Sequence, residues 1–188
     1  MISAAQSAKI KNIAYKCAIY TIALFFVGIA QVTFFSRINV FSATPDLLLA
    51  AIALLCMKED HKVTAICAII SGVFYCAFGG SEYPIYILFS FVCGYVMWIF
   101  AGRAFGKSYA SFLAVCATLF AAKALFNMFY STLFSSTFSF IRTLSSIVLP
   151  EFVSSMIFCS VSYIIFNTLN KIMNRKSRRR KELTKNEF

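Results

Sequence analysis

The feature that most constrains this chain is a series of long apolar segments separated by short polar breaks. A helix that crosses a bilayer needs about 20 mainly apolar residues, and six segments come close to or exceed that length. They cover residues 13–35, 41–57, 62–78, 84–101, 109–133 and 147–172. Soluble domains do not combine 60% hydrophobic with only 13% charged residues. The sequence therefore predicts an all-α, polytopic membrane protein with six transmembrane helices.

Lys and Arg residues are distributed unequally between alternate sides of these segments. Fifteen of the eighteen fall on one side, Arg37 and Arg142 fall on the other, and Lys123 lies within a segment. Because cytoplasmic loops are enriched in Lys and Arg, both termini are predicted to be cytoplasmic. Residues 1–172 then form a single transmembrane domain. Residues 173–188 form a basic tail, which we expect to contact anionic lipids and not nucleic acid.

Patterns typical of enzymes and metal sites do not occur in the sequence. The seven cysteines lie in apolar segments without a Cys-x-x-Cys pair, so we interpret them as small packing residues. The sequence has no His-Glu-x-x-His motif, no phosphate-binding loop and no paired intramembrane carboxylates. We expect no enzymatic activity, no metal and no cofactor.

The start of the second segment carries a carboxylate directly before an apolar run, in the sequence Thr44-Pro45-Asp46. Thr44 is predicted to be the N-cap and Pro45 the first helical residue, which places Asp46 at the positive end of the helix dipole. The second helix would run inward, so Asp46 would lie at the outer face, within reach of water or a partner. A helix start of this kind also needs no function to explain it.

Lys123 lies in the middle of the fifth segment, where a charge costs about 3 kcal/mol on insertion scales. Three interpretations are open from the sequence. The side chain could reach outward to the membrane surface, form a buried hydrogen bond to a neighbouring helix, or take part in ion or proton conduction.

Several of these residues recur in an order that is typical of one family. Gln31 lies late in the first segment, and Pro45-Asp46-Leu47 begin the second. The stretch from residue 72 to residue 96 then places glycines and a tyrosine at set intervals, at Gly72, Gly80, Gly94 and Tyr95. These motifs resemble those of MreD, the rod shape-determining protein family of bacteria. They cover less than half of the chain.

The chain departs from the family pattern at three positions. Val73 replaces a leucine, Cys76 replaces the usual aspartate, and Pro84 stands where the family often has glycine. A role that needs a carboxylate at position 76 therefore does not carry over to this chain.

The resemblance implies a fold similar to the substrate-binding subunits of energy-coupling-factor transporters, in the cytoplasmic (inner) membrane. It also implies a non-enzymatic role in cell elongation and side-wall peptidoglycan synthesis, beside MreC, MreB, RodA and the transpeptidase partner of RodA. In that role we expect Asp46 to present an outward acidic edge to a partner such as MreC. The alternative hypothesis is a vitamin-binding subunit of an energy-coupling-factor transporter.

Overall fold

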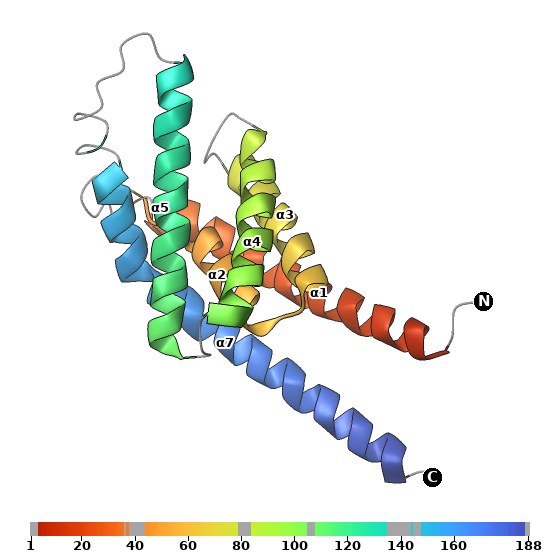
Figure 1. Cartoon of the computed structure of the whole chain (residues 1–188). Coiled ribbons are helices and arrows are strands. Elements are labelled where there is room, and N and C mark those ends of the chain that lie inside the picture. Colours follow the sequence, from red (N-terminus) through yellow and green to blue (C-terminus); the bar gives the residue numbers. More distant parts are fainter. Residues whose placement is uncertain are drawn as a thin grey trace.

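The structure is a computed structural model that describes residues 4–35, 37, 44–78, 84–104, 108–134, 144 and 148–186. All regular secondary structure within these residues is helical, which confirms the all-α prediction. The α-helices are α1 (Ala4–Ala30), α2 (Leu47–Lys58), α3 (His61–Ala77), α4 (Ile85–Ala104), α5 (Tyr109–Phe134) and α7 (Leu149–Asn186), and a short π-helix, η1 (Gln31–Phe35), extends α1 (Figure 1).

Three of the described helices are long and apolar enough to cross a membrane. Their apolar parts are Ile10–Phe35 in α1 and η1, Tyr109–Tyr130 in α5 and Leu149–Met173 in α7. The apolar stretches of α2, α3 and α4 are shorter, at 10–17 residues. Each of the six apolar segments of the sequence therefore contains a helix, and length and composition identify three of them as spans.

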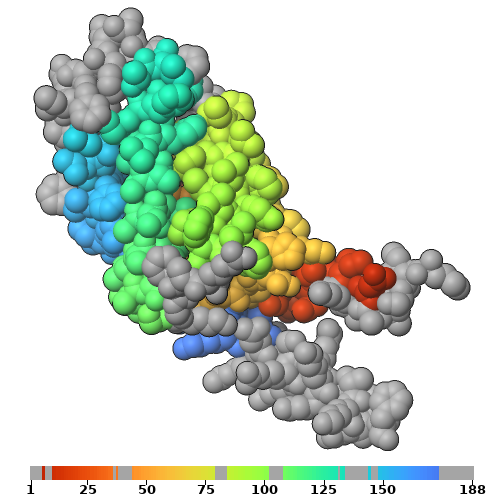
Figure 2. Space-filling view, in the orientation of Figure 1, coloured from red at the N-terminus to blue at the C-terminus, as the bar shows by residue number. Residues whose placement is uncertain are grey.

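Helix α2 is the centre of the bundle. It contacts α1, α3, α4, α5 and α7, and each of its residues from Leu47 to Met57 is buried. In Figure 2, α4 and α5 form much of the face turned toward the reader and cover this helix. At 1.5 Å per residue, twelve residues extend over only about 18 Å. Because α2 is enclosed by protein on all sides, its apolar residues show no preferred face.

Helices α3 and α4 pack closely because Gly72 on α3 has no side chain. A Cβ atom at this position would lie 2.7 Å from the Cα atom of Ile87 on α4. Gly94 on α4 allows a similar approach, since its Cβ atom would lie 2.8 Å from the Cβ atom of Ala68. Small residues commonly permit such contacts between membrane helices. Both glycines therefore act in helix packing.

The last helix is longer than its apolar segment. The sequence predicted that the sixth helix would end at residue 172, whereas α7 continues to Asn186. The basic stretch contains neither Gly nor Pro and is rich in Lys and Arg, which are good helix formers. The predicted tail is therefore helical in its backbone. Its lipid contacts depend on side chains beyond Met173, which lie outside the described part of the chain.

Candidate functional site: a buried ion cluster at the start of the central helix

The first turn of α2 is capped by Asp46. Its Oδ1 atom accepts a hydrogen bond from the backbone N–H of Leu49, at 2.9 Å. The prediction that Thr44 is the N-cap and Pro45 the first helical residue is wrong, because the helix begins at Leu47. Asp and Thr are both suitable caps, and Asp46 is the one that the surrounding helices hold in place.

Side chains from two other helices accept hydrogen bonds from further backbone N–H groups at this helix start. Gln31 in η1 accepts hydrogen bonds at its Oε1 atom from the N–H groups of Leu47, at 3.0 Å, and Leu48, at 3.3 Å. The N–H group of Asp46 donates to the Oγ atom of Ser155 on α7, at 2.9 Å. A helix start leaves such donors without intrahelical partners, and a membrane interior has no water to bind them. Gln31 therefore allows α2 to begin inside the protein.

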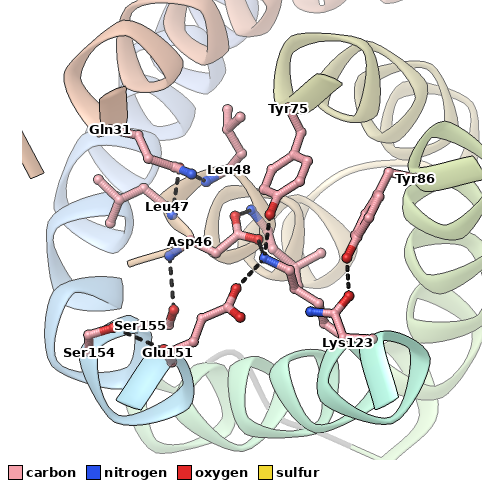
Figure 3. A network of polar contacts seen from close by, with 12 residues as sticks. Gln31, Asp46, Leu47, Leu48, Tyr75, Tyr86, Lys123, Glu151, Ser154 and Ser155 are labelled. Atoms are coloured by element: carbon pink, nitrogen blue, oxygen red, sulfur yellow. Dashed lines mark hydrogen bonds and ion pairs between the residues drawn. The ribbon is translucent and has the colours of Figure 1, made fainter. Parts of the chain in front are cut away.

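Lys123 on α5 lies beside this helix start, as Figure 3 shows. Its Nζ atom lies 2.6 Å from the Oδ2 atom of Asp46 and 2.6 Å from the Oε1 atom of Glu151. It also donates to the hydroxyl of Tyr75 on α3, at 3.0 Å. These three contacts use all three N–H groups of the ammonium. We call Asp46, Lys123 and Glu151 the ion cluster.

The charges of the ion cluster are balanced with the help of the backbone. Two carboxylates face one ammonium, which alone would leave one negative charge in a buried place. Asp46 caps α2 and Glu151 lies in the first turn of α7, and each helix start contributes about half a positive charge. Together these contributions come close to neutrality, which lowers the cost of burying the charges.

The structure corrects two expectations about these charges. Asp46 is only 3% exposed and is turned toward Lys123, so it does not form an outward acidic edge for MreC or another partner. Lys123 is 4% exposed, so it does not reach the membrane surface. Of the three interpretations of Lys123, the observed geometry is that of a buried bond to neighbouring helices. Sequence alone could not choose among them, because the two acids that bind Lys123 are distant along the chain.

Other residues of the sequence motif lie in different places. Pro45 and Leu47 are buried beside the ion cluster, and the carbonyl of Leu47 accepts a bond from Ser162 on α7, at 3.0 Å. Gly94 lies in the contact of α4 with α2 and α3, whereas Tyr95 is 43% exposed on the surface of α4. The structure thus brings Gln31, Pro45, Asp46 and Leu47 together and leaves Gly94 and Tyr95 apart from them.

Cys76, which replaces the usual family aspartate, is partly buried on α3 and forms no disulfide. Gly80 lies outside the described residues.

A second buried charge, which sequence reasoning did not single out, lies at the other end of α2. Glu59 accepts an ion-pair contact from Lys16 at 2.6 Å and hydrogen bonds from Tyr20 at 2.9 Å and Asn170 at 2.7 Å. Its backbone carbonyl accepts a bond from the indole of Trp98, at 3.0 Å. The signal in the sequence is an acid that lies two residues after the end of an apolar segment. Both ends of α2 are therefore fixed by a buried carboxylate.

We expect Glu59→Gln to lower the free energy of unfolding by about 1–2 kcal/mol, since glutamine keeps an acceptor for Tyr20 but loses the charge opposite Lys16. Thermal unfolding in a mild detergent measures this change. The matched control is Asp60→Asn, which removes the same charge one residue later, where the side chain forms no capping bond. If the two variants are equally stable, the Glu59 carboxylate does not stabilise this end of α2.

The chemistry of the site is that of a structural junction. Within the described part of the chain, no group of three or more His, Cys, Asp and Glu side chains could hold a metal ion. Lys123 on α5 donates hydrogen bonds to Asp46 at the start of α2, to Tyr75 on α3 and to Glu151 on α7. Together these contacts join four helices at one point. Comparison with known protein families, with curated proteins and with solved structures finds no match.

Proposed function

We propose that this protein is a non-enzymatic membrane scaffold of the bacterial cell-elongation machinery, the role implied by its resemblance to the MreD family. The proposal rests on a contact between two of the sequence motifs that resemble the family. Gln31 binds the amides of Leu47 and Leu48, directly after Pro45 and Asp46. The glutamine and the Pro-Asp-Leu helix start are joined by hydrogen bonds here. Their occurrence together therefore supports the resemblance to the family more specifically than either motif alone.

We further propose that all six α-helices cross the cytoplasmic membrane, with both termini in the cytoplasm. The uneven distribution of Lys and Arg supports this orientation. The contacts of Glu59 support it as well. They join Lys16, in the first half of the apolar part of α1, to Glu59 after the end of α2 and to Asn170 near the end of the apolar part of α7. In this arrangement the ion cluster lies toward the outer side, and the basic tail meets anionic lipids.

The proposed partners are those implied by the resemblance, namely MreC, MreB, RodA and the transpeptidase that works with RodA. The scaffold is favoured over a vitamin-binding subunit because the space beside Lys123 is small. The cavity there has a volume of about 20 Å³, whereas pockets for small organic ligands measure about 300–1,000 Å³. In the described part of the chain, side chains and the ion cluster occupy the position where converging polar groups could otherwise hold a ligand.

Depletion of the protein in a rod-shaped host should produce round cells, because the scaffold joins components that build the side wall. Vitamin uptake should remain unchanged. Co-purification from mild detergent should recover MreC and RodA with the protein. Restoration of rod shape by a plasmid-borne copy controls for effects on neighbouring genes. Loss of vitamin uptake together with normal cell shape, or recovery of an ATPase module in place of MreC, would favour the transporter hypothesis.

Single-cysteine labelling in a cysteine-free variant tests the proposed orientation. A membrane-impermeant thiol reagent added from outside should label a cysteine at position 82 and should not label one at position 185. In inverted vesicles, the same reagent should label the cysteine at position 185 and should not label the one at position 82. Labelling of position 82 from the cytoplasmic side alone would overturn the orientation.

A further inference from the structure

A small cavity lies beside the ion cluster, between α2, α3, α4 and α5. Its volume is about 20 Å³. Six polar residues line it, together with Leu48, Leu49, Gly72 and Phe89: Asp46, Ser71, Tyr75, Tyr86, Ser90 and Lys123. A buried water molecule needs about 10–15 Å³ of such space and two to four polar partners. The cavity therefore has room for one water molecule and excludes organic ligands.

Two hydroxyl groups in the cavity wall have no partner among the described residues. Ser71 on α3 is 2% exposed and Ser90 on α4 is 6% exposed. No hydrogen bond joins either hydroxyl to another residue in the described part of the chain. Every side-chain nitrogen or oxygen that is completely occluded among the described residues does have a partner. These two hydroxyls must therefore open onto the cavity that they line.

The other side of the cavity offers both a donor and an acceptor. Tyr75 accepts a hydrogen bond from Lys123 at 3.0 Å, which leaves its own O–H proton free to donate. Asp46 binds Leu49 through Oδ1 and Lys123 through Oδ2, and each carboxylate oxygen has a further lone pair. A water molecule here could accept from Tyr75 and donate to Asp46. It would then meet the usual requirement of at least two partners.

We infer that this cavity binds one ordered water molecule, which joins Ser71 on α3 and Ser90 on α4 to the ion cluster through the Asp46 carboxylate. The water extends the junction to α4, which otherwise contributes no hydrogen bond to Asp46 or Lys123 among the described residues. A second cavity, beside Glu151 and Ser155, measures about 10 Å³, which is the lower limit of the space that a water molecule needs. This inference does not depend on the proposed cellular function.

The direct test is an experimental structure of the full chain at a resolution that shows buried waters. We expect one water peak in the larger cavity, within hydrogen-bond distance of the Asp46 carboxylate and of at least one serine hydroxyl. An empty larger cavity, or density larger than a single water, would overturn the inference.

Substitution of the two serines provides a second readout. Ser71→Ala and Ser90→Ala should each lower the unfolding temperature in detergent by about 2–4 °C, because each removes a partner of the same water. The double variant should lose less than the sum of the two, since the sites share one ligand. Ser160→Ala, at an exposed contact with Tyr109, is the control and should shift the temperature by less. Full stability of both single variants would contradict the water bridge.

Discussion

Lys123→Leu should strongly reduce the amount of folded protein, because it leaves the buried Asp46 carboxylate and the partly buried Glu151 carboxylate without their cation. Asp46 and Glu151 each lie 2.6 Å from the Nζ atom of Lys123, and Asp46 is almost fully buried. Removal of one partner from a buried ion pair costs about 3–5 kcal/mol. For a chain of this size such a loss lowers the unfolding temperature by about 10 °C. Thermal unfolding and the yield of monodisperse protein measure the effect.

A charge-neutral triple variant separates the charge effect from the packing effect. Lys123→Leu combined with Asp46→Asn and Glu151→Gln removes all three charges, while the asparagine introduced by Asp46→Asn still provides a good helix cap. Replacement of an entire buried ion cluster is often close to neutral in stability, so the triple variant should recover most of the loss. If Lys123→Leu alone is as stable as the parent, or if the triple variant is no better than the single one, the ion cluster does not have the energetic role assigned to it.

Gly72→Ala should weaken the packing of α3 against α4. The new Cβ atom would lie 2.7 Å from the Cα atom of Ile87 and 3.2 Å from the backbone oxygen of Tyr86. A backbone cannot rotate away as a side chain can, so the two helices must separate. Overpacking of this kind typically costs about 1–3 kcal/mol, and we expect a loss near the upper end of that range in thermal or denaturant unfolding.

The matched control is Gly28→Ala on α1. A Cβ atom there would also approach a neighbour to 2.7 Å, but this neighbour is the ring of Phe78. The ring can turn, and alanine favours a helix by about 1 kcal/mol relative to glycine. We therefore expect Gly28→Ala to remain near parental stability. Equal losses at the two positions would show that contact distance alone, and not the backbone nature of the neighbour, determines the cost.

Sequence by itself determined which six parts of the chain contain apolar helices. Long apolar runs leave a chain in lipid few alternatives to helices, because each backbone group must find a partner within its own segment. Gly72 and Gly94 could likewise be assigned to helix packing from their positions, since small residues are what close helix contacts in lipid require. The start of α2 was not determined locally, since Thr44 and Asp46 are both suitable N-caps.

Only the tertiary structure decided which charges meet. Lys123 and Asp46 are 77 residues apart in the chain, and Lys16 and Glu59 are 43 apart. Such pairs depend on which faces of which helices come together, and that is determined by packing over the whole bundle. The local sequence therefore predicted that Asp46 faces the outer side of the membrane, whereas in the structure its side chain points into the helix bundle. Burial of this carboxylate is tolerable because Lys123 and backbone amides of α2 bind it.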